Sequence, residues 1–503
     1  MKTKIQFFGG VSGKLTGSSI LLTIKEGSRT LKILFDIGLI QGGFTESLIR
    51  NREILKFLDP REITHIILTH SHIDHIGRLP LLVKNGFRGQ IVCTKGSYNL
   101  LEVMLMDSAK IQVTESAHSN AKLNKGKNRR HINFNPLTDN DYYQKKREKK
   151  EKKTTPLYTE AEVKETMYRI KNNGYDYHQW IKIDHNVHLK FYPSGHVMGG
   201  AIIVLRTQTK TGDYFYCFSG DLGRSDGIIL PPPEIVKEKI DYLVIESTYG
   251  GKNHPPREQE LQKLLELIKQ VSKSKQKMII PSFSLERTQE IIYLLSYYMN
   301  QKSIPKIPIY IVGPLSTKVT LIFADNWQSG AMFSDQNLLD FNPFDPQDNP
   351  YINLITTKKG SNELISANGA GIVIAGSGTC DAGMVRDYLK AYLGNPGSII
   401  CLVGYLPENS FGRRIKENKP LKMSGKSLEV RCQIQSFDSF SAHADGLDLV
   451  NYVRKTLPKT VKKIFIVHGE TIGSFNLQND LAKYFEKEKI VIPSINEEFI
   501  LIE

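Results

Sequence analysis

The sequence lacks the features that would place it in several large classes of protein. Its 503 residues include only five cysteines, which are scattered, odd in number and never spaced as a Cys-x-x-Cys pair. This argues against a disulfide framework and a structural zinc ribbon, and it favours a reducing compartment. The N-terminus has no apolar signal-peptide core, and no run of about 18 apolar residues occurs anywhere. We therefore expect a cytoplasmic protein without a membrane partner.

Acidic residues are the scarcer charged class. The chain has 67 Lys and Arg residues against 52 Asp and Glu residues, a formal net charge of +15. Residues 121–153 hold 12 basic and 4 acidic side chains, which is about half of this excess. Such a tract is either a solvated face or an electrostatic collar for a nucleic-acid backbone, and the two are compatible. The excess thus fits a polyanionic partner, although solubility alone would explain it.

A dense group of potential metal ligands follows a predicted strand at residues 65–68. The segment THSHIDHIGRLP, residues 69–80, places four of them within six positions: His70, His72, Asp74 and His75. Alternation along an extended chain puts the first two on one face, and the following turn can bring the others toward the same point. Four zinc-type ligands exceed what one tetrahedral ion takes from a single loop. The segment therefore predicts two metal ions, against the alternative of a polar turn.

Side chains of the same chemistry recur at the ends of later strands. Strands are expected at residues 187–192 and 214–218, in the run DYLVIE, and at residues 463–467. The polar residues in the loops beside them, or before a later helix, are His196, Asp221, Glu246, His443 and His468. Because α/β folds place their chemistry in loops after strands, this recurrence predicts one shared site.

The N-terminal hundred residues predict a β-hairpin followed by alternating strands and helices. Strands are expected at residues 5–8, 19–24 and 31–35, and a helix at residues 100–117. Asp36 directly follows the third strand. It either orients a metal ligand by a hydrogen bond or is an ordinary turn or helix-capping aspartate.

From residue 251 the pattern changes to plain α/β alternation. A helical stripe covers residues 257–271, and strands at residues 278–280, 307–312 and 371–375 each run into a Gly/Ser turn before a helix, with Ser284 as an expected N-cap. Helix N-termini bind anions, so these turns predict a phosphate-binding cleft unless they are merely common turns. The candidate substrate-binding residues are Ser284, Arg287, Lys318, Ser377 and Gly378. Strands resume at residues 399–404 and 428–437.

Together these motifs resemble the metallo-β-lactamase superfamily and, within it, the β-CASP nucleases. The His-x-His-x-Asp-His signature is shared with glyoxalase II and the lactamases. In contrast, Glu246 in ESTYG, His443 in FSAHAD and His468 in VHGE resemble motifs specific to β-CASP proteins. The similarity also includes PSFSLERTQE and GSGTCDAGM and runs nearly end to end. Within the family, the chain resembles prokaryotic relatives of the cleavage and polyadenylation endonuclease subunit.

The resemblance implies an α/β fold, an αββα metallo-β-lactamase sandwich with an inserted α/β β-CASP domain. The first part of the sandwich would be residues 1–250, the β-CASP domain residues 251–398, and the completing part residues 399–503. In the inserted segment, residues 312–315 read Val-Gly-Pro-Leu and residues 382–384 Ala-Gly-Met, where the family often has Asp-Ser-Pro-Leu and Gly-Gly-Arg. These departures concern substrate binding rather than metal binding.

The resemblance also implies a ligand set and catalytic roles. One zinc ion would take His70, His72 and His196, a second would take Asp74, His75 and His468, and Asp221 would bridge them. The implied catalytic residues are Asp74, His443 and Glu246, with His443 as the general acid, oriented by Glu246, that protonates the leaving ribose oxygen. Two zinc ions are the expected cofactors, with manganese as the alternative for this ligand set.

The expected function is that of a zinc-dependent ribonuclease that cleaves single-stranded RNA by a two-metal mechanism, in RNA processing or degradation. RNA is favoured because His468 stands where DNA-repair members tend to carry an apolar residue. One alternative is a DNA-acting β-CASP nuclease. Another is a glyoxalase-type small-molecule hydrolase, which leaves Glu246, His443 and the inserted segment unexplained, and a third is a non-catalytic RNA-binding protein. The oligomeric state stays open, with a homodimer as one option.

Overall fold

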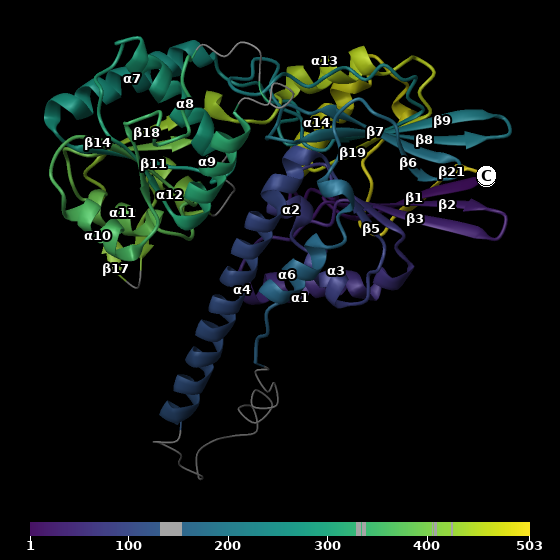
Figure 1. Cartoon of the computed structure of the whole chain (residues 1–503), viewed down its shortest axis with the longest axis horizontal. Coiled ribbons are helices and arrows are strands. Elements are labelled where there is room, and N and C mark those ends of the chain that lie inside the picture. Colours follow the sequence, from purple (N-terminus) through teal and green to yellow (C-terminus); the bar gives the residue numbers. More distant parts are fainter. Residues whose placement is uncertain (131–152, 328–332, 334–338, 405, 407–409, 424–425) are drawn as a thin grey trace.

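The computed structural model describes residues 1–130, 153–327, 333, 339–404, 406, 410–423 and 426–503 (Figure 1). The predicted basic tract at residues 121–153 falls mainly outside this part of the chain. Figure 1 shows two bodies, one formed by the N-terminal and C-terminal parts of the chain and one formed by its middle. The long helix α4 (Lys95–Arg130) runs between them and extends beyond both.

Two mixed sheets form the first body. The first sheet has the order β21-β1-β2-β3-β4-β5, with β1 at Lys2–Gly9, β2 at Ser19–Glu26, β3 at Arg29–Phe35, β4 at His65–Ile67, β5 at Gln90–Val92 and β21 at Glu498–Ile502. The second has the order β20-β19-β10-β9-β8-β7-β6, with β6 at Ile181–Asp184, β7 at Val187–Pro193, β8 at Ala201–Thr209, β9 at Gly212–Phe218, β10 at Tyr242–Glu246, β19 at Lys463–Val467 and β20 at Ile490–Val491. The expected N-terminal hairpin and the strands that precede the candidate ligands are therefore present.

The two sheets pack face to face because each has one continuous apolar face. Phe35 of β3 stacks on Phe218 of β9 with ring centroids 3.6 Å apart, and Phe7 of β1 meets Phe465 of β19 at 5.2 Å. The central strands β10 and β19 pair in parallel and are apolar on both faces, as strands covered on both sides must be. The layer between the sheets is the core that fixes the ends of these strands.

Helices cover the outer face of each sheet. The first sheet carries α1 (Phe44–Glu53), α2 (Ile73–Ile76), α3 (Leu79–Lys84), α4 and α6 (Glu160–Met167), whereas α13 (Gly446–Thr456) and α14 (Thr471–Leu481) pack on the second. Short 3-10 turns lie at Ile54–Lys56, Pro60–Glu62, Lys171–Asn173, Asp438–Phe440 and Lys487–Lys489. This arrangement is the predicted αββα sandwich. Helix α4 begins five residues before the expected start, where the Thr94 hydroxyl accepts from the Ser97 backbone N–H.

The second body is built on a parallel sheet. Its order is β13-β12-β14-β11-β15-β18, with β11 at Lys277–Pro281, β12 at Ile309–Val312, β13 at Ile352–Ile355, β14 at Gly371–Ala375, β15 at Ile399–Val403 and β18 at Gln433–Phe437. Its helices are α7 (Arg257–Ser274), α8 (Arg287–Asn300), α9 (Pro314–Asn326), α10 (Lys358–Ser366), α11 (Val385–Tyr392) and α12 (Phe411–Lys416). Strand β16 (Leu421–Met423) pairs antiparallel with β17 (Lys426–Leu428). The consecutive residues Met278 and Ile279 of β11 point to opposite faces of the sheet and belong to different apolar clusters, so helices cover both faces of this sheet.

Two sequence predictions are corrected here. The predicted domain boundary at residue 398 divides this sheet, because β15 pairs with β11 and β18 pairs with β15. The inserted body therefore continues to Phe437. Ser284 is not the N-cap of α8, since this helix begins at Arg287 with Glu286 at the N-cap position and no side-chain capping bond. The Ser284 hydroxyl instead lies 2.8 Å from that of Ser316.

The two bodies are joined by direct packing as well as by the chain. Helix α4 contacts α9 of the inserted body, and Asn99 donates to Asn326 Oδ1 at 3.0 Å. The apolar cluster under the first sheet continues into α7, α8 and α9. Within the described part of the chain, no helix is both long and apolar enough to cross a membrane.

Candidate metal centre

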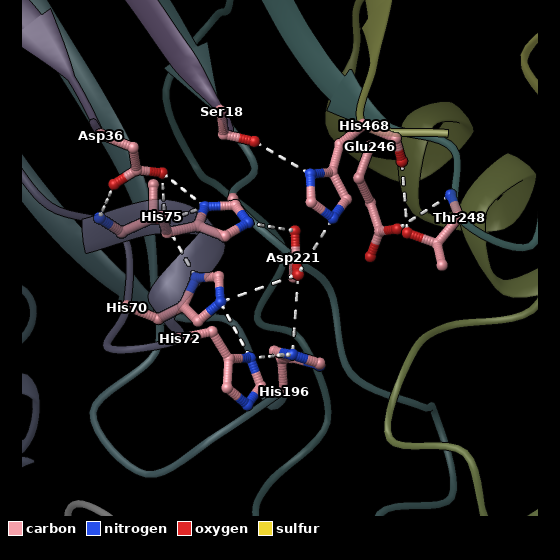
Figure 2. A network of polar contacts seen from close by, with 12 residues as sticks. Ser18, Asp36, His70, His72, His75, His196, Asp221, Glu246, Thr248 and His468 are labelled. Atoms are coloured by element: carbon pink, nitrogen blue, oxygen red, sulfur yellow. Dashed lines mark hydrogen bonds and ion pairs between the residues drawn. The ribbon is translucent and has the colours of Figure 1, made fainter. Parts of the chain in front are cut away.

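The candidate ligands meet at one edge of the sandwich, where strands of both sheets end. The segment after β4 supplies His70 to His75, the loop before β8 supplies His196, and the loops after β9 and β19 supply Asp221 and His468 (Figure 2). All are buried except His72 and Asp74, which are half-buried. Residues separated by nearly 400 positions thus converge because their strands end side by side.

A first group of ligand atoms consists of those of His70, His72, His196 and Asp221, which lie within 4.8 Å of one another. His72 Nδ1 is 3.2 Å from His70 Nε2 and 3.2 Å from His196 Nε2. Two nitrogens bound tetrahedrally at about 2.05 Å from zinc would be roughly 3.3 Å apart. The spacing of these imidazoles therefore matches the edges of a zinc tetrahedron.

A second group consists of Asp74, His75 and His468, whose ligand atoms also lie within 4.8 Å of one another. Asp221 lies between the two groups. Its Oδ2 is 3.7 Å from His70 Nε2 and from His196 Nε2, and 3.6 Å from His468 Nε2. Its Oδ1 is 3.3 Å from His75 Nε2. One carboxylate can therefore reach both groups.

The chemistry of the buried atoms fits metal ions. His75 Nε2 and Asp221 Oδ1 face each other, and among the described residues neither has a hydrogen-bond partner. Burial lowers the pKa of His70 and His196 well below the ordinary value and that of His72 to about 4. These imidazoles are thus held neutral, which is the state that ligates metal. Imidazole nitrogens gathered around a buried carboxylate are a donor set that suits a divalent cation.

Asp36 and Thr69 orient two of the imidazoles. Asp36 Oδ2 lies 2.7 Å from His75 Nδ1 and accepts from the Thr69 hydroxyl at 2.7 Å, while Oδ1 accepts from the Thr69 backbone N–H. The Thr69 oxygen lies 3.0 Å from His70 Nδ1. Because the Thr69 proton points to Asp36, this oxygen can accept from His70 Nδ1–H. Both Nε2 atoms are then free to face Asp221. Of the two sequence readings of Asp36, these contacts favour the orienting role.

His468 is held by the loop between β1 and β2. Its Nδ1 lies 2.9 Å from the Ser18 hydroxyl, and its backbone N–H donates to Gly10 O at 2.6 Å. Arg78, from the same THSHIDHIGRLP segment, is fully buried beneath this loop and donates to Gly17 O and to the Ser19 hydroxyl. Burial lowers the pKa of Arg78 to about 9. Sequence reasoning missed Ser18 because a serine in a Gly/Ser loop carries no chemical signal.

His443 and Glu246 form a pair beside the metal centre. His443 Nδ1 lies 3.5 Å from Glu246 Oε1, and the His443 ring is 4.3 Å from that of His196, centroid to centroid. Glu246 is buried and fixed by the backbone N–H groups of Leu222 at 2.7 Å and Thr248 at 3.1 Å. Burial opposes protonation of His443, but Glu246 and then more distant carboxylates outweigh it and raise the pKa of His443. The pair is thus arranged to keep a proton next to the candidate ligands.

His254 lies behind His443. Its Nε2 is 3.0 Å from the carbonyl oxygen of His443, and its backbone N–H donates to Asp445 Oδ2. The ring packs on Tyr249 with centroids 4.4 Å apart. His254 therefore supports the loop that carries His443. A lone histidine in a polar stretch gave no signal of this contact.

The predicted substrate-binding residues divide into two sets. Ser284 and the Ser377–Gly378 turn lie at the ends of β11 and β14, and a Cβ added at Gly376 would be 3.0 Å from Ser284 Oγ. These residues meet at one edge of the parallel sheet. In contrast, Arg287 is buried in an ion pair with Glu290. Lys318 is exposed on α9 near α4, where its charge acts on the carboxyl of Asp107.

Three segments of the chain match known protein families. Residues 32–145 match the metallo-β-lactamase superfamily, residues 288–415 the Beta-Casp domain, and residues 427–493 the Zn-dependent metallo-hydrolase RNA specificity domain. Their order along the chain is that of a sandwich interrupted by the inserted body. The third match covers both His443 and His468.

Similar proteins align over most of the chain. A protein of Thermus thermophilus named Ribonuclease TTHA0252 is 27% identical over 466 residues, which is 92% of each chain. Proteins named Transcription termination factor FttA are 24% identical in Cenarchaeum symbiosum and 27% identical in Pyrococcus abyssi. These alignments cover 95% and 84% of this chain but 68% and 59% of the relatives. The chain thus carries matches to the metallo-β-lactamase superfamily and to the Beta-Casp domain, and it is similar to these relatives over most of its length.

Proposed function

We propose that this protein is a metal-dependent ribonuclease that hydrolyses phosphodiester bonds of single-stranded RNA. The observation that carries the proposal is the pairing of His443 with Glu246 at 3.5 Å directly beside two groups of metal ligands. A small-molecule hydrolase of the superfamily needs the ligands but not a second proton-carrying pair. The match to an RNA specificity domain, which contains His443, supports RNA as the substrate.

We assign the two groups of ligands to two zinc ions. His70, His72 and His196 would hold one, Asp74, His75 and His468 the other, and Asp221 would reach both. Such a pair of ions supplies Lewis-acid activation of water and neutralises negative charge that develops on the phosphoryl oxygens. Asp36, Thr69 and Ser18 would keep the imidazoles in the tautomers that leave the ligating nitrogens free.

His443 would act as the general acid. Glu246 holds it from the Nδ1 side, so that Nε2 is left to carry a proton to the ribose oxygen that leaves the scissile phosphate. General acid catalysis of this kind contributes about 10²–10⁴-fold to the rate. Asp74 would add a carboxylate next to the attacking water. His254 and Tyr249 would fix the His443 loop from behind.

The edge of the parallel sheet would hold the RNA backbone. Ser284, which the buried Ser316 hydroxyl contacts, and the Ser377–Gly378 turn place hydroxyl groups and backbone N–H groups at the carboxyl ends of adjacent strands. Crevices at this edge of α/β sheets are where anionic ligands bind. The exposed ring of Phe283, 42% accessible in the same turn, offers an apolar surface beside them.

Two further candidates share the same metal centre. A DNA-acting nuclease of the family would use the same ligands. The similarity to the protein named Ribonuclease TTHA0252, whose alignment with this chain covers 92% of that protein, favours RNA instead. A glyoxalase-type hydrolase would leave the inserted body without a role. The three differ in substrate rather than in ligand set.

Incubation of the purified protein with zinc and end-labelled single-stranded RNA or DNA of the same sequence separates these candidates. The proposal predicts cleavage of RNA that stops when a chelator removes the metal and returns on addition of zinc. Hydrolysis of the glyoxalase II thioester substrate is measured in parallel. Cleavage of DNA alone, or of the thioester alone, would contradict the assignment to RNA.

A further inference from the structure

Glu286 occupies an unusual backbone conformation at the start of α8. Its φ and ψ are +70° and −60°, and the Arg287 N–H donates to Leu285 O at 3.0 Å, which closes a γ-turn around Glu286. This positive-φ form of the γ-turn is rare and strained for a residue with a side chain. Such a conformation persists only where surrounding contacts hold it. The contacts of the Glu286 side chain are therefore informative.

The Glu286 carboxyl reaches from the inserted body into the metallo-β-lactamase body. It is 2% exposed, and Oε2 accepts from the backbone N–H of Met198 at 3.1 Å. Met198 is two residues after His196, in the loop that connects β7 to β8. Burial, and then the charge of Glu290, raise the pKa of Glu286 well above its ordinary value. This buried carboxyl thus makes its hydrogen bond to a backbone group of the His196 loop.

His196 differs from the other imidazoles in its support. His75 meets Asp36, His70 meets Thr69 and His468 meets Ser18, each through Nδ1. The Nδ1 atom of His196 is buried and has no hydrogen-bond partner among the described residues. No hydrogen bond from a described side chain therefore holds the Nδ1 side of the His196 ring, so the backbone of its loop matters more for its position.

Several hydrogen bonds anchor the His196 loop, and two of them flank the segment that follows His196. At Gly199, the carbonyl oxygen accepts from the hydroxyls of Thr94 at 2.5 Å and Ser97 at 2.9 Å, both at the start of α4. At Met198, the N–H donates to Glu286. The first anchor belongs to the same body as the loop, whereas the second comes from the inserted body. Glu286 thus connects α8 by a hydrogen bond to the loop that carries the candidate ligand His196.

We propose that Glu286 is a positioning residue that places His196 by holding the Met198 N–H, and so couples the inserted body to the metal centre. The metal-binding part of this proposal rests on the proposed role of His196 as a ligand. The Glu286 carbonyl also accepts from the Glu290 N–H at 2.9 Å inside α8, so movement of α8 moves the anchor. RNA that binds at the Ser284 turn, two residues before Glu286, would therefore act on the metal centre through this contact.

Three substitutions distinguish the effect of losing the hydrogen-bond acceptor from the effect of the backbone strain at Glu286. Glu286→Gln keeps a carbonyl oxygen of the same reach. Glu286→Ala removes the acceptor and keeps the positive φ, whereas Glu286→Gly removes the acceptor and relieves the strain. Ser296→Ala is the matched control, because it removes a buried hydrogen bond, 2.8 Å to Asn349, from the same helix without touching the loop.

Amide hydrogen exchange of the peptide that covers residues 194–200, in the metal-free full chain, tests the link without reference to catalysis. The proposal predicts exchange at Met198 about tenfold faster in the Ala and Gly variants, the change expected for loss of one hydrogen bond, and wild-type exchange in Glu286→Gln and Ser296→Ala. Zinc affinity should fall by about 10- to 100-fold in the Ala and Gly variants alone. Wild-type exchange in Glu286→Ala, or equal effects of Gln and Ala, would overturn the proposal.

The two readouts keep this proposal distinct from the proposed function. Faster exchange at Met198 with unchanged zinc affinity would show that Glu286 holds the loop but does not position a ligand, which overturns the coupling. Failure of the wild-type protein to cleave RNA would overturn the ribonuclease assignment and leave the exchange result intact.

Discussion

The contacts of Asp36 make Asp36→Asn the most informative single change beside the metal centre. Asp36 Oδ2 faces two donors, His75 Nδ1 and the Thr69 hydroxyl, each at 2.7 Å. Asparagine keeps the oxygen that accepts from the Thr69 backbone but puts an N–H₂ group where Oδ2 was. His75 then loses the acceptor that keeps its proton on Nδ1. Its Nε2 is no longer free to bind metal.

The size of the effect follows from these contacts. Loss of a buried partner of a metal-bound histidine costs roughly 10–100-fold in metal affinity, about 1.4–2.7 kcal/mol. Asparagine tolerates the φ of +55° at residue 36, so the backbone adds little to this cost. We therefore expect the variant to fold and to bind the ion of the Asp74, His75 and His468 group more weakly.

Competition with a chromophoric chelator measures zinc affinity, and elemental analysis gives the number of ions per chain. Asp241→Asn is the control, because Asp241 accepts from the Phe215 N–H at 2.9 Å at the start of β10, away from the end that carries Glu246. We expect wild-type zinc binding in the control and fewer ions in Asp36→Asn at the same free zinc. Wild-type affinity for both ions in Asp36→Asn would refute the orienting role.

Three further predictions concern other parts of the chain. His443→Ala should retain both metal ions and lose at least about 10²-fold in RNA cleavage, whereas metal loss would make His443 a ligand. The pKa of Glu286 in the folded protein is raised above 4.5, so the stability that this residue contributes is lost as pH rises above that value. The Tm of Glu286→Gln relative to that of the wild type should therefore increase above pH 4.5. A Tm difference that stays constant with pH would contradict this. Gly38→Ala should abolish metal binding, because its Cβ would lie 1.4 Å from Asp74 O and would displace the ligand segment. Gly43→Ala should leave metal binding unchanged, because a Cβ there would have no neighbour within 4 Å.

The sequence predicted the fold and the candidate ligands for separate reasons. Apolar alternation located the strands, because a sheet with one buried face must alternate. The ligands were recognised because five histidines and two aspartates at strand ends are rare by chance and share one chemistry. The structure brings all of them to one edge of the sandwich.

The errors arose where a local pattern does not specify its partner. Strands β15 and β18 are ordinary apolar runs, and nothing in them tells which sheet they join, so the boundary at residue 398 was placed too early. Ser284 has the composition of an N-cap, but the γ-turn at Glu286 delays the helix. Both depend on contacts distant in sequence.

The residues that support the site were missed for a related reason. Ser18, His254 and Glu286 act through single hydrogen bonds to residues 88 to 450 positions away. Their residue types have many uses, and their neighbours in the sequence show no pattern. Only the folded arrangement distinguishes them from ordinary loop and helix residues.

The most direct test of the two-metal assignment is a zinc titration of the metal-free protein, with cleavage of end-labelled single-stranded RNA as the readout. Because Asp221 reaches both ligand groups, we expect little cleavage with one ion per chain and full cleavage only with two. Full activity at one equivalent, or cleavage that persists in excess chelator, would contradict the account.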